Sequence, residues 1–181
     1  MGTIIAGPAP LPVALAELKA FLRISTGDED ALLAAVARAA ADMCEAFTGR
    51  PLIERAVAEV LAAGTGWTRL GTAPVRAILG VEALAADGTA TALAAEAYAV
   101  DIDAAGEGRV RLLGGIGETR VRAAYRAGLA ADPNGVPETL RHGIIRLAAY
   151  LYTQREQTGR GTGPPAAVTA LWRPWRRLRL G

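Results

Sequence analysis

The sequence predicts an α+β fold: a small helical domain with three main helices, an antiparallel β-rich insertion between helices 2 and 3, and an extended C-terminal tail. Apolar residues recur at helical spacing near both ends of the chain, whereas between about residues 52 and 126 they partly alternate with polar ones. Residues 160–181 differ again, because they contain five arginines and no acidic residue. The 181 residues suffice for one domain with an extension, and we place the domain at residues 1–159.

The first helix is predicted at about residues 13–23, after a proline-rich lead-in. Leu15, Leu18 and Leu22 stand at i, i+3 and i+7, so they share one face of a helix. This short helix therefore offers one apolar stripe to a core.

The second helix is predicted at about residues 28–48. Three polar residues before or at its start are candidate N-caps: Ser25, Thr26 and Asp28. Gly49 can adopt the left-handed conformation that ends a helix, and Pro51 prevents the helix from resuming. The apolar residues expected to face the core follow at helical spacing: Leu32, Val36, Ala39, Met43 and Phe47.

The segment from about 52 to 126 is predicted to form four to six short antiparallel strands. Turn residues such as Asp87-Gly88 and Gly114-Gly115 separate its apolar runs. In the last run the side chains alternate between two faces. Val121, Ala123 and Tyr125 point one way, and Arg120, Arg122 and Ala124 point the other.

The third helix is predicted at about residues 137–157, with Pro137 in the first turn, where proline is tolerated. Its core stripe consists of Leu140, Ile144, Leu147 and Leu151. Ile145, Tyr150 and Tyr152 widen the apolar surface beyond that stripe. A helix that is apolar over so much of its circumference usually has a second surface to cover. We therefore expect these three side chains to lie in a contact between subunits.

Residues 160–181 are predicted to be a linker followed by an extended tail, since Pro164, Pro165 and Pro174 favour an extended course. The segment "ALWRPWRRLRL" combines two tryptophans with four arginines, the residue types that most often carry interface energy. Two interpretations stay open. The tail docks on another protein, in which case deleting residues 168–181 leaves a folded domain, or it packs back on its own helices.

The sequence lacks the residues of the common catalytic and metal sites. His142 is the only histidine and Cys44 the only cysteine, which excludes a two-histidine metal site and an intrachain disulfide. The glycine-rich "LLGGIGETR" lacks the lysine of a P-loop. We expect no catalytic, metal or cofactor site, an inert buried thiol at Cys44, and His142 at the surface or an interface.

No membrane span or secretory signal is expected either. The apolar windows are far shorter than the roughly 20 residues that cross a bilayer. The N-terminus "MGTIIAGPAPLP" has no basic region before a long apolar one. A soluble protein made in the cytoplasm is the expectation.

Seven segments follow one another along the chain: "LAELKAFLRI", "TGRPL", "PVRAILGVEAL", "YAVD", "RVRAAYRAGL", "VPETLRHGIIRLAAYLYTQRE" and "LWRPWRRLRL". Their order resembles the head-tail connector, or adaptor, family of tailed phages, in the branch with a β-rich insertion between the second and third helices. The resemblance spans about residues 13–180. The "PWRRLRL" ending and the Ala- and Arg-rich composition are also similar to the adaptor of a gene transfer agent, a domesticated phage particle made by some bacteria.

This resemblance implies a structural role and no enzymatic activity. Adaptor subunits of the family form a dodecameric ring beneath the portal of a DNA-filled head, with the stopper and tail attached below. Double-stranded DNA leaves through the ring without sequence-specific binding. The implied location is the neck of a virion or gene-transfer-agent particle assembled in bacteria, without cofactor or membrane. The expected portal-binding residues are Leu171, Trp172, Arg173, Trp175, Arg176, Arg177, Leu178, Arg179 and Leu180.

Two other functions compete with this one. In a nucleic-acid-binding protein, the tail arginines would hold phosphates while Trp172 or Trp175 stacks on bases. Residues 1–159 carry 15 basic and 18 acidic residues, so they offer no basic excess to extend that footprint. A membrane-surface tail is the other alternative, and Pro174 disfavours the amphipathic helix that such binding prefers.

A DNA channel makes a further demand on the β-rich insertion. Unpaired arginines in a narrow ring would hold phosphates and oppose the passage of DNA. We therefore expect four arginines to be paired with acids or turned away from the lumen: Arg109, Arg111, Arg120 and Arg122.

Overall fold

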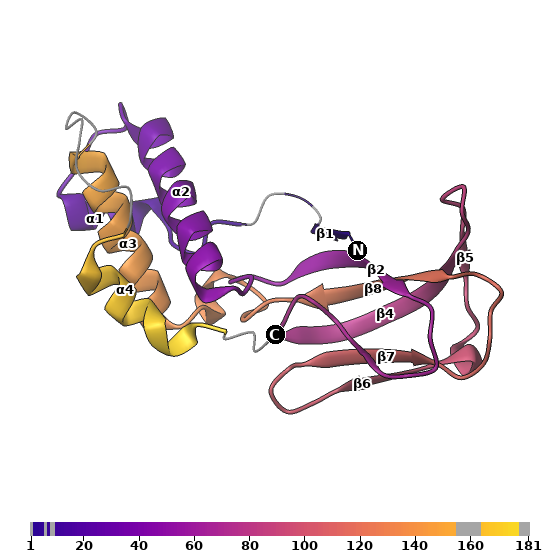
Figure 1. The fold of residues 1–181 in the computed structure, drawn as a ribbon. Coiled ribbons are helices and arrows are strands. Elements are labelled where there is room, and N and C mark those ends of the chain that lie inside the picture. The colour runs from indigo at the N-terminus through magenta and orange to yellow at the C-terminus, as the bar shows by residue number, and fades with distance from the viewer. Residues whose placement is uncertain (1, 6, 8–9, 155–163, 178–181) are drawn as a thin grey trace. The chain divides into compact units, whose positions relative to one another are not determined.

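The chain folds into two compact units, which we call the β unit and the helical unit. The computed structural model describes residues 2–5, 7, 10–154 and 164–177, and Figure 1 traces them along the chain. The β unit comprises residues 1–9 and 53–129, and the helical unit comprises residues 10–52 and 130–181. The predicted α+β class is confirmed, and the β-rich insertion is a unit of its own.

Two antiparallel sheets make up the β unit. Their strands are β1 Thr3–Ile5, β2 Arg55–Ala62, β3 Thr68–Arg69, β4 Val75–Leu84, β5 Ala90–Ala92, β6 Tyr98–Ile102, β7 Gly108–Leu112 and β8 Arg120–Ala127. One sheet has the spatial order β1-β2-β8-β4-β5 and the other the order β3-β7-β6. More strands form than were predicted, because β3 and β5 span only two and three residues, too few for alternation to reveal them.

The core of the β unit brings together buried residues of the two sheets. Val121, Ala123 and Tyr125 of β8 are buried, as their alternation predicted, whereas Arg122 and Ala124 between them are only partly buried. The other large members of this core come from both sheets and the loop before β4: Val57, Leu61, Leu70, Val75, Val81, Val110 and Leu112. The β unit is therefore a small two-sheet sandwich.

A buried carboxylate fastens the loop before β4 to the sheet. Glu59 of β2 is 7% exposed, and its Oε2 accepts hydrogen bonds from the Tyr125 hydroxyl at 2.7 Å and from the backbone N–H of Gly71 at 2.8 Å. The same hydroxyl accepts a hydrogen bond from the backbone N–H of Thr72 at 3.2 Å. Burial raises the pKa of Tyr125 to about 12, so the hydroxyl keeps the proton that it donates to Glu59.

The four arginines singled out in the β unit have different partners. Arg122 pairs with Glu82 at 2.6 Å, and Arg109 lies 3.4 Å from Asp101. Arg120 donates to the carbonyl oxygen of Ala85, and the guanidinium carbon of Arg111 lies 4.8 Å from the ring centre of Trp67. The expected pairing with acids is thus confirmed for Arg109 and Arg122, while Arg111 and Arg120 use an aromatic ring and a carbonyl.

The helical unit contains the three predicted helices and a fourth. They are α1 Leu15–Leu22, α2 Asp30–Thr48, α3 Glu138–Thr153 and α4 Ala166–Trp172, with short 3₁₀ turns η2 Pro133–Gly135 and η3 Arg173–Trp175. As predicted, α2 ends at Gly49 with a left-handed φ of 68°. Leu140, Ile144 and Leu147 of α3 are buried in the predicted core stripe, and Leu151 at its end is half-buried.

The face that α2 buries is not the one predicted. The buried residues are Leu33, Ala37, Ala40, Ala41, Cys44 and Thr48. In the predicted stripe Leu32 and Ala39 are exposed, and Val36, Met43 and Phe47 are half-buried. The prediction followed the larger apolar side chains, but small residues (three alanines, a cysteine and a threonine) form most of the buried face. Small side chains let neighbouring helices approach α2 closely. The predicted stripe is therefore rotated about the helix axis, away from the buried face, by roughly the angle that separates two successive residues.

The two segments of the helical unit meet where the β unit is inserted. The backbone N–H of Ala130 donates a hydrogen bond to the carbonyl oxygen of Leu52 at 3.0 Å. Both residues are buried, so the chain leaves and re-enters the helical unit at adjacent points.

Candidate docking face of the helical unit

Helix α4 corrects the expected extended tail for residues 166–175. It begins after Pro165 and continues through alanine, leucine and tryptophan, which a helix accommodates readily, until Pro174 converts it to the turn η3. Val168 and Trp172, four residues apart, both point into the unit and are buried. The prolines thus mark the ends of a short helix and do not extend the whole segment.

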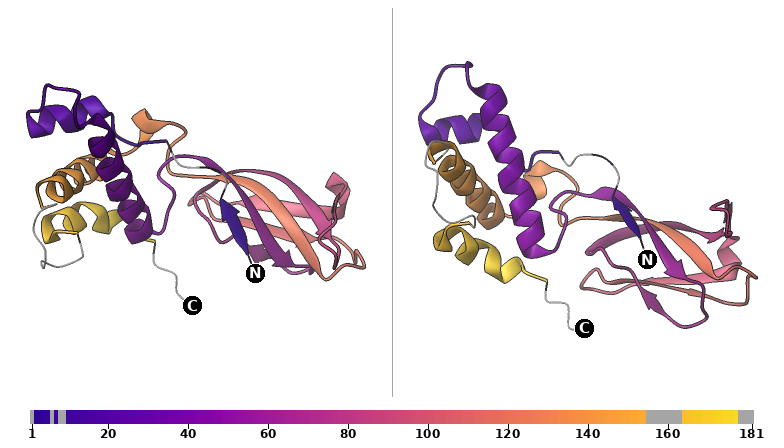
Figure 2. Two further views of the ribbon diagram at one scale, coloured as in Figure 1. Left: turned by 90° about the horizontal axis from the view of Figure 1, so that it is seen from above. Right: turned by 45° about the horizontal axis from the view of Figure 1, so that its top comes forward.

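Trp172 is part of the core of the helical unit. Its side chain is 0% exposed, and its ring centre lies 5.9 Å from that of Phe47 in α2. The indole also lies against the α3 backbone, since a Cβ placed on Gly143 would be 2.2 Å from its Nε1 atom. For this residue the second interpretation of the tail is correct, because Trp172 packs back on its own helices, and Figure 2 shows α4 beside α3 in both views.

Two hydrogen bonds hold the segment after α4 in place. The indole N–H of Trp175 donates to Oγ1 of Thr139 in α3 at 3.0 Å. The backbone N–H of Arg177 donates to the carbonyl oxygen of Thr48 at the end of α2 at 2.8 Å. Carbonyls in the last turn of a helix lack partners inside the helix, so Arg177 satisfies one of them. The segment is therefore fixed to two different helices.

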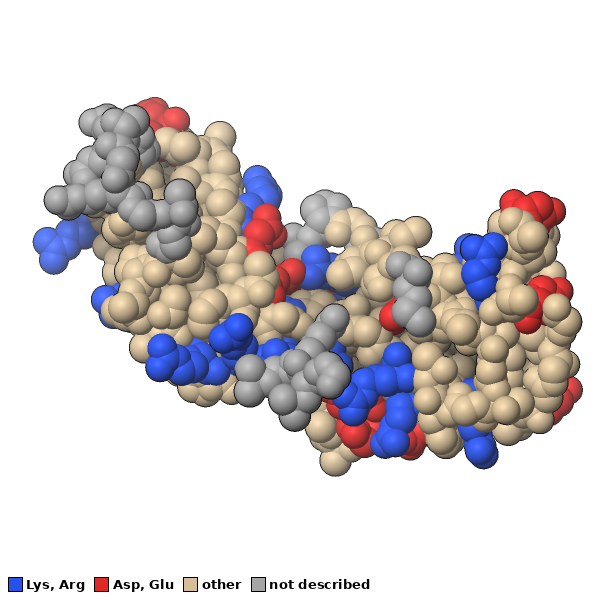
Figure 3. All heavy atoms as spheres, in the orientation of Figure 1, with Lys and Arg blue, Asp and Glu red and all other residues tan. Residues whose placement is uncertain are grey.

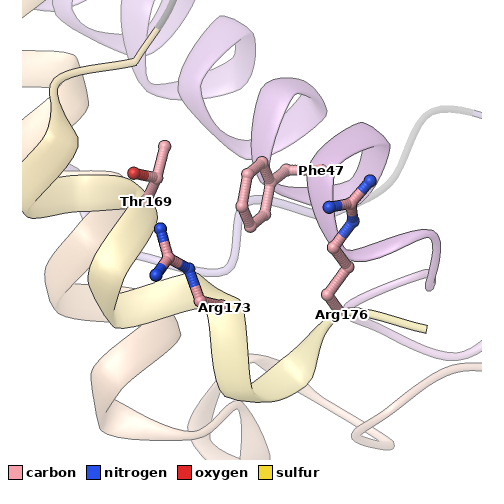
Figure 4. Close-up of a pocket in the computed structure, with 4 residues that line it drawn as sticks. All are labelled: Phe47, Thr169, Arg173 and Arg176. Carbon is pink, nitrogen blue, oxygen red and sulfur yellow. The ribbon is translucent and has the colours of Figure 1, made fainter. Parts of the chain in front are cut away.

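The exposed side of this segment carries cations around a hollow. Phe47, Thr169, Arg173 and Arg176 line a hollow of about 320 Å³ (Figure 4). Arg173 and Arg176 are exposed, and the guanidinium carbon of Arg176 lies 5.7 Å from the ring centre of Phe47. In the space-filling view, blue atoms gather where α4 ends (Figure 3). We call these four residues together with Trp175 the docking face.

The docking face is suited to binding an anion beside an apolar group. Among the described residues, no acid forms an ion pair with Arg173 or Arg176. A guanidinium can form two parallel hydrogen bonds with a carboxylate or a phosphate. The ring of Phe47 supplies an apolar surface between the two arginines (Figure 4). Charge and shape together favour a partner that carries a negative group next to an apolar one.

The remaining residues of the predicted portal surface are distributed differently. Leu171 and Arg177 are half-buried, and Trp172 is buried. Leu178, Arg179 and Leu180 lie outside the described residues. Only part of the predicted set is therefore available on the surface that the structure describes.

The three predicted subunit-contact residues of α3 are all half-buried. The hydroxyl of Tyr152 donates a hydrogen bond to Glu29 just before α2, so part of this side chain serves the unit itself. Ile145 has a purely apolar side chain, and the Tyr150 hydroxyl forms no hydrogen bond with the described residues. They keep an apolar surface that is partly accessible.

The single cysteine and the single histidine lie where the sequence predicted, the first buried and the second at the surface. Cys44 is fully buried, and burial raises the pKa of its thiol to about 12, which leaves it protonated and unreactive at neutral pH. His142 is exposed and lies edge-on to Phe21, with ring centres 6.4 Å apart. In the described part of the chain, no three His, Cys, Asp or Glu side chains gather as metal ligands, and no helix is long and apolar enough to span a membrane.

Several residues of the docking face were missed from the sequence. Phe47 was assigned to the core of the second helix, and Thr169 carried no recognisable signal, nor did Thr139, which holds Trp175 in place. A usable signal did exist at Gly143, because a glycine inside an otherwise apolar helix commonly marks a close packing contact. It marks the place where α4 docks.

The whole chain is similar to chains in solved structures of gene transfer agent particles. A chain in the neck of an empty gene transfer agent particle, computed with C6 symmetry, matches with a TM-score of 0.79 and 28% identity, covering 99% of this chain and 97% of that one. A chain in the virion of a native particle and one in a native neck with C12 symmetry match at TM-scores of 0.77 and 0.76, with the same identity and coverage. No protein-family model and no curated protein matches the chain.

Over nearly its whole length the chain is therefore similar to chains of gene transfer agent particles, two of them from the neck. The resemblance inferred from the order of seven segments is thereby confirmed. The structural match extends over both units, including the β-rich insertion. In this chain the docking face is formed by α4, the turn η3 with Arg176 after it, and Phe47 of α2.

Proposed function

We propose that this connector-family protein is a head-tail adaptor subunit in the neck of a gene transfer agent or phage-like particle. The observation that carries the proposal is the docking face, which stands on a fixed segment and combines an aromatic ring with two arginines that have no acidic partner in the described part of the chain. It occurs in a chain that matches neck-particle chains over 99% of its length. A structural protein that joins two larger components needs such a surface.

In this proposal the docking face binds the portal. Arg173, Trp175 and Arg176 make the contact, with Leu171 and Arg177 at its border. Leu178, Arg179 and Leu180 continue it beyond the described residues. Trp172 acts indirectly, because its burial fixes the position of Arg173 and Arg176, which follow it in the chain. The stopper or tail-completion protein attaches elsewhere on the ring.

The proposed assembly is a ring of this chain, with twelve copies in the closed form. Ile145, Tyr150 and Tyr152 lie at or near the contacts between subunits. Double-stranded DNA passes through the ring without sequence-specific binding. The ion pairs of Arg109 with Asp101 and of Arg122 with Glu82 support this, since neutralised arginines grip phosphates weakly.

Co-purification of the purified chain with its portal tests the proposal. Replacing Arg173 and Arg176 with glutamate should abolish portal binding, and Trp175→Ala should weaken it by about 2 kcal/mol, roughly thirtyfold in Kd. Arg38→Glu is the matched control, because Arg38 is exposed on α2 away from the hollow. Particles assembled with the double variant should be heads without tails. Portal binding that survives the double variant would place the attachment surface elsewhere.

Nucleic-acid binding remains the second candidate, because the same unpaired arginines suit phosphates. The two functions respond differently to salt. For binding through phosphates, the logarithm of the binding constant falls steeply and linearly with the logarithm of the salt concentration. The affinity of a protein contact anchored by Trp175 and Phe47 should change little with salt. Measuring both affinities over one salt series therefore separates the portal from DNA as the ligand.

A further inference from the structure

Helix α2 carries a second apolar stripe that the core of the helical unit does not use. Leu32, Val36, Ala39 and Met43 follow one another at spacings of 4, 3 and 4 residues, the pattern by which helices pack along a shared seam. Leu32 is 39% exposed, Ala39 is exposed, and the other two are half-buried. We call these four residues the α2 seam.

The surroundings of the α2 seam are flat and carry little charge. Ala35 and Ala46 border it on the side away from the core, and both are exposed. Asp42 is the nearest exposed charged residue on that side, and among the described residues it has no ion-pair partner. Small side chains let a second helix approach closely. The alanines at and beside the seam therefore leave room for the larger side chains of a helical partner.

A surface of that kind exists elsewhere on the same unit. Phe21 of α1 is 50% exposed, and His142 of α3 lies edge-on to it at 6.4 Å. Ile145, one turn further along α3, is half-buried. We call Phe21, His142 and Ile145 the aromatic patch. Arg146 lies beside this patch, is exposed, and has no ion-pair partner among the described residues. Its charge is opposite to that of Asp42 beside the seam.

We propose that the α2 seam of one subunit packs against the aromatic patch of the next copy of this chain. The proposal rests on the ring of the proposed function and specifies its lateral contact. The seam offers an apolar stripe bordered by small alanines and an acid, and the patch offers large apolar groups next to a base. These two surfaces complement each other, and each lies on the helical unit of the same chain.

The use of two different surfaces has a consequence for symmetry. A contact between unlike patches is head-to-tail, so it can repeat from copy to copy and closes into a ring when the rotation permits. The solved neck structures that this chain resembles were computed with C6 and C12 symmetry, which repeated copies of one chain satisfy. A contact of the seam with itself would instead stop at a dimer.

Disulfide trapping with the full-length chain tests this contact. We would prepare Ala39→Cys, His142→Cys and the double variant, retaining Cys44, whose buried thiol with a raised pKa does not compete. The double variant should form a ladder of dimers, trimers and higher species on mild oxidation. The two single variants, when mixed, should form only the mixed dimer. Ala31→Cys mixed with His142→Cys is the control, because Ala31 is exposed on α2 outside the seam.

Each outcome decides the proposal. A ladder from the double variant supports it, whereas mixed dimers no more abundant than in the control overturn it. Efficient dimers from Ala39→Cys alone also overturn it, because the seam would then pair with itself. Adding Leu32→Glu to the Ala39→Cys partner should lower the trapped yield about tenfold, since an unpaired carboxylate against apolar side chains is unfavourable. Folding is checked by circular dichroism, and the helix tolerates glutamate at this partly exposed position.

The failure of this proposal is distinguishable from failure of the adaptor assignment. The seam variants leave the docking face unchanged, so they should bind an isolated portal subunit normally. Loss of lateral trapping with normal portal binding would retain the adaptor role and reject this contact alone. Loss of portal binding by the Arg173 and Arg176 variants, with intact trapping, would leave the ring contact untouched.

Discussion

Gly143 of α3 and Trp172 of α4 are in direct contact, and the contact leaves no room for a side chain at position 143. A Cβ there would lie 2.2 Å from the indole Nε1 atom and 2.9 Å from Cδ1. A glycine inside a helix costs about 1 kcal/mol relative to alanine. Here the glycine permits a tryptophan to be completely buried, so the helix is weakened locally in exchange for a close contact between two helices.

Gly143→Ala should therefore destabilise the helical unit, despite the better helix propensity of alanine. Overpacking of this kind typically costs about 1–3 kcal/mol, and displacement of Trp172 should change the near-ultraviolet circular dichroism. Chemical denaturation measures the loss. Gly115→Ala is the control, because a Cβ at position 115 meets nothing within 4 Å. Equal stability of the two variants would contradict the close packing at Gly143.

The two tryptophans of the C-terminal segment should behave differently. Trp172→Ala should lower the free energy of unfolding by about 3–5 kcal/mol, the cost of emptying a buried aromatic site. Trp175→Ala should cost about 1 kcal/mol, because this side chain is only half-buried. Denaturation curves of both variants test the difference. Deletion of residues 168–181 should likewise destabilise the helical unit, contrary to the expectation for a free tail.

Tyr125→Phe tests the buried carboxylate of the β unit. The change removes the hydroxyl that donates to Glu59 and accepts from the N–H of Thr72. Leaving Glu59 with one donor fewer in a buried site should cost about 1–3 kcal/mol. The double variant Tyr125→Phe with Glu59→Gln should show clear non-additivity, because the two side chains share one hydrogen bond. Additive losses would mean that the bond contributes nothing.

Stability at acid pH should depend on Glu17. A hydrogen bond from Arg141 holds the pKa of this carboxyl below its ordinary value of 4.5. As pH falls through 4.5, the unfolded chain binds the proton before the folded chain does, so this contribution is present above that pH and is lost below it. Since 41% of the Glu17 side chain is exposed, solvent screening keeps the effect modest. Glu17→Gln should flatten the pH dependence of unfolding in this range, and should add nothing once Arg141 is changed to glutamine.

The sequence was a good guide where large side chains decide the structure. The stripe Leu140, Ile144 and Leu147 and the alternation ending at Tyr125 were predicted correctly, because burial of large apolar groups dominates their placement. It failed on α2, where small residues form most of the buried face and the periodicity of larger residues pointed to Leu32 and its neighbours. Close packing between helices depends on small side-chain size, which the pattern of hydrophobic residues does not show.

The docking face was predicted only in part for a related reason. Arg173, Trp175 and Arg176 were recognised by residue type, but the hollow also needs Phe47, which lies more than a hundred residues away in sequence. Proline was read as a signal for extension, whereas Pro165 and Pro174 bound a helix that tertiary contacts stabilise. Such contacts with Gly143 override the local preference, and a single sequence does not display them.

The hydrogen bond between Leu52 and Ala130 makes the β unit an exchangeable module. Because the two attachment points are already joined, the helical unit would close in the same way around an insert of any size whose ends can meet. Selection could then lengthen, reshape or replace the sandwich without disturbing Trp172, the docking face or the α2 seam. A lineage of particles could thus change what its neck presents mainly through residues 53–129, with residues 1–9 supplying only the edge strand β1, while keeping the helices that assemble it.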